Sequence, residues 1–149
     1  MIVLRNVHKR FGQQVVLDGV DLDVQEGETL ALLGPSGTGK SVLLKHIIGL
    51  IRPDTGSIVV DDQDVGKLKR QDLAALRSRI GYVFQNGALF DSMNVLENVR
   101  LGITDGEKYR DDDYATQRVA ECLKLVNLAA EVMTKFPAEL SGGMRKRVG

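Results

Sequence analysis

A glycine-rich segment of eight residues carries the clearest chemical pattern in the chain. It follows the pattern G-x-x-x-x-G-K-[ST], in which a lysine and a hydroxyl residue come directly after the last glycine. Glycine lets backbone amides approach phosphate oxygens that a Cβ atom would block, and lysine adds positive charge. These residue types predict a cradle for a nucleoside triphosphate. The segment comprises Gly34, Pro35, Ser36, Gly37, Thr38, Gly39, Lys40 and Ser41.

The polar residues at the end of this segment have distinct predicted roles. The Lys40 ammonium can reach the β- and γ-phosphates of the nucleotide, and Ser41 Oγ can ligate Mg²⁺. The alternative is an ordinary glycine-rich turn with a lysine that faces solvent. GTPases, small-molecule kinases and transport ATPases all use such a loop, so this segment alone leaves the family open.

The flanking residues predict the elements that hold the segment in place. Residues 29–33 form a short and nearly all-apolar run, which is typical of a central strand buried on both faces of a sheet. Apolar residues then repeat at helical spacing over residues 43–51, and Pro53 stops the helix. A strand, the loop and the first turn of a helix would therefore meet at the phosphate, where the positive end of the helix dipole attracts an anion.

The rest of the chain divides into a strand-rich part and a helical part. We expect strands near the start of the chain, with others over residues 57–60 and 80–84 and a helix over residues 69–79 between these two. After the boundary near Asn86, Asn94 can cap a helix and a further helix begins near Asp112. The predicted domains are residues 1–86 and 87–149.

Composition excludes several classes of function. The chain has 20 basic and 20 acidic residues, so it lacks the excess of positive charge expected of a general nucleic-acid binder. With Cys122 as the single cysteine, neither an intrachain disulfide nor a cysteine-rich zinc site can form. His8 and His46 are too few and too separated for a metal site, and we assign them to surface or packing roles. No apolar run spans a membrane, so membrane association requires a partner.

A second motif with anion-binding character lies near the end of the sequence. Ser141 is a good helix N-cap, and Gly142 and Gly143 would let the first turn of that helix approach a phosphate closely. The alternative is a capped helix with a flexible entry. The three basic residues at 145–147 are too few for a nucleic-acid patch and fit a solvated helix surface.

These two motifs together make the sequence resemble the ATP-binding subunits of ABC transporters. The segment Leu140-Ser141-Gly142-Gly143 matches their signature motif. Phe11 occupies the place of the aromatic residue that stacks on adenine, although it could instead be a packed strand residue. Gln85 occupies the place of the Q-loop glutamine, although it could be a simple polar loop residue. The resemblance implies an α/β P-loop NTPase fold with a parallel core sheet, an N-terminal antiparallel β subdomain and a helical subdomain.

The resemblance also implies a set of site residues and partners. Two copies would sandwich two ATP molecules head to tail as a homodimer, with Mg²⁺ held by Ser41 and Gln85 and with Lys40 and Gln85 in catalytic roles. An integral membrane permease would place the dimer at the cytoplasmic face of the cell membrane as a peripheral protein, with no nucleic acid bound. The implied ATP contacts are Phe11, Gly34, Pro35, Ser36, Gly37, Thr38, Gly39, Lys40, Ser41 and Val42, and those to the ATP of the partner subunit are Ser141, Gly142, Gly143 and Met144.

A narrower resemblance concerns the transported substrate. Residues 39–45 and 84–95, with methionine rather than the commoner glutamine at Met144, look like the ATPases of MCE-type transporters, which move phospholipids. Apolar residues near Gln85 would then receive a coupling helix of the permease, or else pack in the core; they are Ala88, Leu89, Phe90 and Met93. Other functions stay open: an importer of a small polar solute, a soluble ABC-type ATPase that remodels ribosomes or chromosomes, and a small-molecule phosphotransferase.

The chain departs from the ABC pattern at its end. The family pattern includes a later apolar strand that ends in Asp-Glu and a still later histidine, and neither lies within these 149 residues. Asp61 and Asp62 also end an apolar strand, but they come too early and fit a solvated turn, with a kinase-like metal role for Asp61 as the alternative. We therefore expect the front part of a longer ATPase, without the C-terminal part of its ATPase domain. By itself, we expect it to be poorly soluble, self-associating or domain-swapped, and to hydrolyse ATP negligibly.

Overall fold

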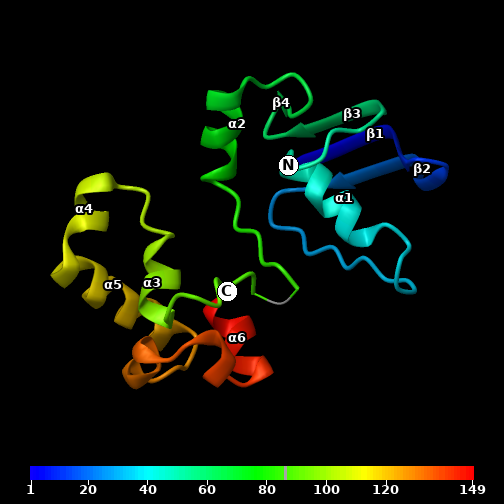
Figure 1. Ribbon diagram of the computed structural model, residues 1–149. Coiled ribbons are helices and arrows are strands. Elements are labelled where there is room, and N and C mark those ends of the chain that lie inside the picture. Colours follow the sequence, from blue (N-terminus) through cyan, green and yellow to red (C-terminus); the bar gives the residue numbers. More distant parts are fainter. Residues whose placement is uncertain (86) are drawn as a thin grey trace. The chain divides into compact units, whose positions relative to one another are not determined.

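A four-stranded antiparallel sheet begins the chain. In the computed structural model, which describes residues 1–85 and 87–149, the strand order is β2-β1-β3-β4 (Figure 1). Hydrogen-bonded pairs join β1 to β2 along nearly their full length, and β1 to β3 on its other side. This sheet confirms the predicted strands at the start and over residues 57–60. The strands are β1 (Ile2–Phe11), β2 (Gln14–Val24), β3 (Thr55–Val60) and β4 (Gln63–Asp64).

A two-residue turn joins β3 to β4. Asp61 and Asp62 both have positive φ, 45° and 62°, which matches a hairpin turn that favours aspartate, asparagine and glycine. The Asp61 carboxylate accepts from the N-terminal ammonium of Met1 at 3.0 Å and pairs with the Arg79 guanidinium. The turn interpretation of this acidic pair is therefore confirmed.

This turn gives stability a predicted pH dependence. The N-terminal ammonium, by its hydrogen bond, and then the Arg79 guanidinium hold the pKa of Asp61 below its ordinary value of 3.8. A pKa lowered in the folded state adds stability above the ordinary value, and that stability is lost as the pH falls through the folded value. We expect Asp61→Asn to reduce the loss of urea resistance between about pH 5 and pH 3. Identical acid curves for the variant and the parent chain would contradict this.

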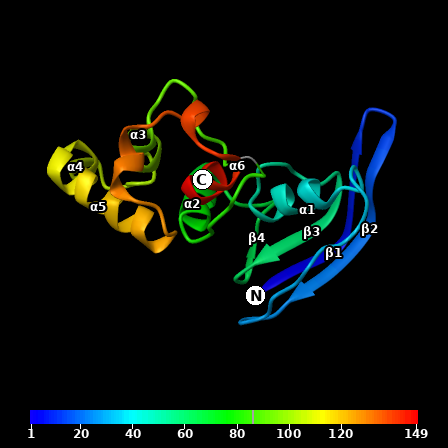
Figure 2. The same cartoon turned by 90° about the horizontal axis from the view of Figure 1, so that it is seen from below.

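Two helices complete the first unit. The helix α1 (Lys40–Ile47) lies against β3 (Figure 2) and α2 (Arg70–Arg77) follows the hairpin. The predicted helices over residues 43–51 and 69–79 are confirmed, with the first ending earlier and turning at Gly49, where φ is +66°. Apolar side chains from the sheet and both helices form one buried core: Leu4, Val7, Leu17, Leu43, Ile47, Ile58, Val60, Val65 and Leu76.

The predicted parallel strands are not formed. Residues 29–33 and 80–84 have no regular secondary structure, and within them Leu33 is 91% exposed and Val83 is 70% exposed. An apolar run becomes a strand only where a neighbouring strand completes its hydrogen bonds, and no described strand pairs with either run. The sheet of the described residues is thus antiparallel, and the expectation of a parallel sheet within them was wrong.

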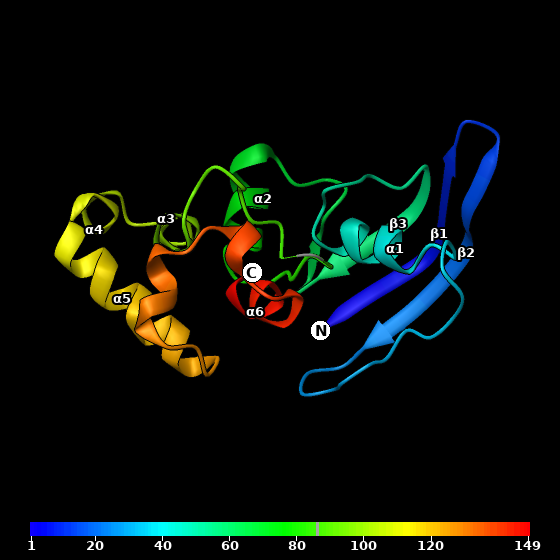
Figure 3. The ribbon, with the colours of Figure 1, turned by 60° about the horizontal axis from the view of Figure 1, so that its bottom comes forward.

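The second unit is helical. As predicted, Asn94 caps α3 (Val95–Arg100), its side chain accepting from the Glu97 amide at 2.9 Å, and α5 begins at Asp112. The helices α3 and α4 (Gly106–Arg110) both lie against α5 (Asp112–Leu125), as Figure 3 shows. Two short 3-10 helices, η1 (Ala130–Thr134) and η2 (Pro137–Glu139), lead to α6 (Gly142–Val148). The buried core is Val95, Val119, Leu123, Leu128, Val132 and Leu140.

The two units are Met1–Gly81 and Tyr82–Gly149. Asn86, where the sequence analysis places the boundary, lies outside the described residues. The roles given to residues 1–86 and 87–149, as nucleotide-binding core and helical subdomain, stay predictions. Among the described residues, no helix combines the length and apolar character needed to cross a membrane.

Candidate nucleotide-binding site

The glycine-rich segment forms an exposed loop that leads into α1. Residues 34–38 are exposed, whereas Gly39 is buried and adopts a left-handed conformation, with φ of +89°. A Cβ atom at Gly39 would stand 2.8 Å from the Val16 carbonyl oxygen on β2, so only glycine fits without displacing that strand. The sheet therefore fixes where the loop ends and where the helix begins.

Lys40 places its charge within the loop. Its ammonium donates to the carbonyl oxygens of Gly34 at 2.7 Å and Pro35 at 2.6 Å, and it lies 3.3 Å from Thr38 Oγ1. The Thr38 hydroxyl in turn donates to the Pro35 carbonyl at 2.9 Å. The cation thus sits where the motif predicts the phosphates, surrounded by exposed backbone that an anion can reach.

The far end of α1 is held by groups that the sequence analysis did not single out. Arg77 of α2 donates to the carbonyl oxygens of Ile48 at 2.9 Å and Gly49 at 2.7 Å, so it caps the carboxyl end of the helix. Inside the helix, His46 is fully buried with Nδ1 at 2.7 Å from the Val42 carbonyl, which confirms a packing role. Only the tertiary structure identifies Arg77, since no local pattern links it to carbonyl oxygens 28 and 29 residues earlier.

The loop has the donors that Mg²⁺ bound with a nucleotide would need. Magnesium at phosphate sites takes few protein ligands and completes its shell with phosphate oxygens and water. Ser41 is exposed in the first turn of α1 and offers its hydroxyl, as predicted. Within the described part of the chain, no group of three His, Cys, Asp or Glu residues could hold a metal ion by itself. These residues fit a magnesium ion that arrives with the triphosphate.

Phe11 stands in the same unit as this loop. It is the last residue of β1, it is 47% exposed, and it pairs with Gln14 across the hairpin turn. The Lys9 ammonium lies over its ring, 5.5 Å from the centroid. An exposed aromatic face supported by a cation suits stacking on a base more than packing in a core.

The signature segment opens α6 in the second unit. Ser141 Oγ accepts from the Met144 amide at 3.2 Å, so the predicted N-cap is confirmed. In the part of the chain that the structure describes, no atom lies within 4 Å of the place that a Cβ would take at Gly142 or Gly143. The internal packing of the described part of this unit therefore does not require glycine at either position.

Arg147, one of the basic residues after this segment, makes hydrogen bonds within the unit. Arg147 donates to the carbonyl oxygens of Val126 at 3.3 Å and Asn127 at 3.0 Å, where α5 ends. These contacts satisfy carbonyls left unpaired at a helix end and tie α6 to α5. The expectation of a purely solvated role for residues 145–147 was incomplete, because their sequence pattern does not show this contact.

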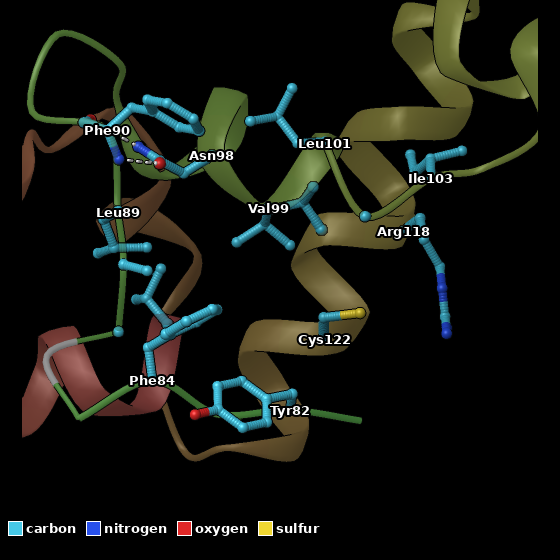
Figure 4. Close-up of a pocket in the computed structure, with 16 residues that line it drawn as sticks. Tyr82, Phe84, Leu89, Phe90, Asn98, Val99, Leu101, Ile103, Arg118 and Cys122 are labelled. Carbon is cyan, nitrogen blue, oxygen red and sulfur yellow. Dashed lines mark hydrogen bonds between the residues drawn. The ribbon is translucent and has the colours of Figure 1, made fainter. Parts of the chain in front are cut away.

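A hollow of about 560 Å³ lies in the second unit (Figure 4). Ala88, Leu89 and Phe90 line it, as does Cys122 of α5, and Phe90 is 56% exposed. Of the four predicted groove residues, Met93 is not among the lining side chains of the described part. Gln85 is an exposed turn residue next to this region in sequence.

Asn98 of α3 holds the loop beside this hollow. Its Oδ1 accepts from the Phe90 amide at 2.7 Å, and its Nδ2 donates to the carbonyl oxygens of Phe90 at 3.1 Å and Met93 at 2.9 Å. Asn98 was not among the predicted site residues, although an asparagine one helical turn after a capping asparagine is a usable signal for such a contact.

Comparison with known proteins places these motifs in one family. The family model described as ABC transporter matches residues 17–149. The probable ribonucleotide transport ATP-binding protein mkl of Mycobacterium leprae is 43% identical over 148 residues, covering 99% of this chain and 42% of the relative. The sulfate/thiosulfate import ATP-binding protein CysA of Caulobacter vibrioides is 44% identical over 150 residues, with the same two shares. The chain thus spans 42% of the length of these curated relatives.

Solved structures agree with the sequence matches. The dimeric ATP-binding cassette MJ0796, in a post-hydrolysis state bound to ADP and Pi, superposes with a TM-score of 0.82 at 35% identity. This match covers 99% of the present chain and 66% of that one. The predicted ABC ATPase fold class is confirmed, apart from the parallel sheet that the described residues do not form, and the chain belongs to the ABC transporter family.

Proposed function

We propose that this chain is the nucleotide-binding part of an ABC transporter subunit that couples ATP binding and hydrolysis to transport. The observation that carries this proposal is the Lys40 ammonium, held by the Gly34 and Pro35 carbonyl oxygens of an exposed glycine-rich loop at the start of α1. The proposed ATP contacts are those of the sequence analysis, namely the loop residues, Val42 and Phe11. Ser41 would hold Mg²⁺, whose charge would stabilise the negative charge on the transferred phosphate.

Catalysis in this proposal consists of positioning and charge stabilisation. Phosphoryl transfer to water needs little covalent chemistry from the protein. Most of the transition-state stabilisation would therefore come from the glycine-rich loop, Lys40 and the metal. In the family pattern, the acid that orients the attacking water comes from the later Asp-Glu strand.

Two copies of the complete protein would share each ATP molecule. The proposed contacts to the partner's nucleotide come from Ser141, Gly142, Gly143 and Met144, at the tip of α6. Open space around both glycines supports this role, since a neighbouring phosphate could approach the helix end there. The related cassette MJ0796 is described as a dimer bound to ADP and Pi.

A bulky charged residue at the helix tip should block this sandwich. We expect Ser141→Arg in the full-length protein to lower the rate of ATP hydrolysis about tenfold or more, because overfilling a packed interface costs about 1–3 kcal/mol. Binding of ATP to the monomer should not change, since the loop in the same chain is intact. Steady-state ATPase rates and sedimentation with ATP test both points.

A matched control separates the interface effect from misfolding. Thr134 is an exposed hydroxyl residue of the same unit, and Thr134→Arg should leave the ATPase rate unchanged. If Ser141→Arg hydrolyses ATP at the parent rate, the sandwich is excluded and a phosphotransferase that works as a monomer becomes the better explanation.

The membrane partner is proposed from the second unit. Ala88, Leu89 and Phe90 border a hollow that is large enough to receive apolar side chains of a coupling helix, with Asn98 stiffening its rim. Docking there would hold the protein at the cytoplasmic face of the membrane. A soluble ATPase that acts on ribosomes or chromosomes would instead co-purify with RNA or DNA, so tagged pull-down with the neighbouring gene products distinguishes the two.

The proposed cargo is phospholipid or another lipid. The support is the sequence resemblance of residues 39–45 and 84–95, with Met144, to ATPases of MCE-type transporters. Similarity to CysA, named for sulfate and thiosulfate import, favours a second candidate, an importer of a small polar solute. Reconstitution of the full-length protein with its permease tests both: transfer of labelled phospholipid that needs ATP supports the first, and uptake of sulfate supports the second.

A further inference from the structure

An ion pair lies next to the Phe11 ring, on which a nucleotide base is proposed to stack. Lys9, two residues before Phe11 on β1, places its ammonium over one face of the Phe11 ring. Its side chain is only 15% exposed, and it also reaches Asp54 Oδ1 at 2.7 Å and the Arg52 carbonyl at 2.9 Å. Lys9 thus lies over one face of a ring that belongs to a residue 47% exposed.

Asp54 joins this strand to the segment that follows α1. Its Oδ2 accepts from the Arg10 amide at 2.7 Å, and its own amide donates to the His8 carbonyl at 2.9 Å. Asp54 therefore makes hydrogen bonds to three consecutive residues of β1, from His8 to Arg10. The hydrogen bond from Lys9 and then the Arg10 amide hold the pKa of Asp54 below its ordinary value, in agreement with a persistent contact.

These contacts connect the two ends of the proposed nucleotide site. The phosphate loop begins α1, and Arg52 and Asp54 lie shortly after α1 ends, before β3 returns beside β1. Residues of α1 and β1 also share one buried core, including Leu43, Ile47, Leu4 and Val7. The position of the Phe11 ring relative to the glycine-rich loop is thus set by β1 and by the contacts that Lys9 and Asp54 make.

We propose that Lys9 and Asp54 are positioning residues, which hold the Phe11 ring at the height and angle that lets a base stack while the triphosphate fills the loop. This inference rests on the proposed role of Phe11 in ATP binding. It assigns the two residues to recognition of the base and not of the phosphates. They should therefore affect ATP and a ligand without a base differently.

The experiment compares ATP with inorganic tripolyphosphate, each titrated with Mg²⁺ into this chain by calorimetry. Phe11→Ala should lower the ratio of ATP affinity to tripolyphosphate affinity about tenfold, in line with the loss of one stacked base. Lys9→Met and Asp54→Asn should each lower this ratio about two- to fivefold, and Lys9→Arg, which keeps the cation and the ion pair, should restore it. In a Phe11→Ala background, Lys9→Met should change the ratio no further.

A second ion pair of the same unit supplies the control. Lys67 and Asp64 pair at 2.8 Å on the surface, so Lys67→Met removes a cation and a pair without touching Phe11 and should leave the ratio unchanged. Equal loss of affinity for both ligands in the Lys9 and Asp54 variants would show a merely structural role and overturn the proposal, as would no loss for either. If Phe11→Ala itself leaves the ratio unchanged, Phe11 does not stack on the base, and the proposed positioning roles of Lys9 and Asp54 are excluded with it.

Discussion

Replacement of Lys40 with alanine is expected to weaken ATP binding by this chain about 10- to 150-fold. A hydrogen bond to a charged group contributes about 1.5–3 kcal/mol, and the β- and γ-phosphates would lose their only side-chain cation in the loop. The stability of the fold should change little, because water can replace the ammonium at the exposed carbonyls of Gly34 and Pro35. Calorimetric titration with ATP and Mg²⁺ measures the affinity, and a urea melt measures the stability.

Lys45 offers the matched control for this experiment. It lies in the last turn of α1, away from the loop, so Lys45→Ala removes the same charge from the same helix without touching the cradle. We expect parent affinity for ATP in this variant. Equal affinity in the Lys40 and Lys45 variants would mean that the triphosphate does not bind in the loop, and the proposed function would lose its main support.

The largest loss of stability is expected from Gly56→Ala, at the start of β3. Gly56 has φ of +90°, and a Cβ atom there would stand 2.3 Å from the Asn6 carbonyl oxygen and 2.6 Å from that of Arg5. Both contacts are with backbone, so β1 and β3 would have to separate where they pair. Overpacking and a left-handed conformation together cost about 3 kcal/mol or more, which lowers the melting temperature by about 10 °C or more.

A substitution at Gly12 separates the two causes of lost stability, which are the strain of a positive φ and the steric clash of a Cβ atom. It also has a positive φ, +59°, but no atom of the described chain lies within 4 Å of the place for its Cβ. Gly12→Ala should therefore change stability by about 1 kcal/mol or less, since the conformational strain is partly offset by a stiffer unfolded chain. Thermal melts followed by circular dichroism make the comparison. Similar melting temperatures for the two variants would contradict the predicted clash.

Local features of the fold could be predicted from the sequence because their causes are local. The Asn94 and Ser141 caps accept from amides three residues ahead, and the turn at residues 61–62 uses residues that tolerate positive φ. The glycine-rich loop is likewise a pattern of neighbouring residues. Helix periodicity also operates within a few turns, which explains why α5 begins at the predicted Asp112.

The two expected parallel strands show the limit of such patterns. Apolar character in residues 29–33 and 80–84 predicts burial, but a strand also needs a neighbour that completes its backbone hydrogen bonds. The described residues provide none, and Leu33 is left exposed. The apolar pattern therefore identifies segments that suit a sheet, but it does not show whether another strand is available to pair with them.

By itself, the sequence determined the motifs, their order and the types of groups that they offer to a nucleotide: a cradle of amides with Lys40, and a capped helix tip at Ser141. Only the tertiary structure decided which distant groups hold these motifs in place. Arg77 caps the end of α1, Arg147 ties α6 to α5, and Asp54 grips β1 beneath Phe11. Each of these contacts joins residues at least 20 positions apart, and a chain reveals such neighbours only when its backbone has folded to bring them together.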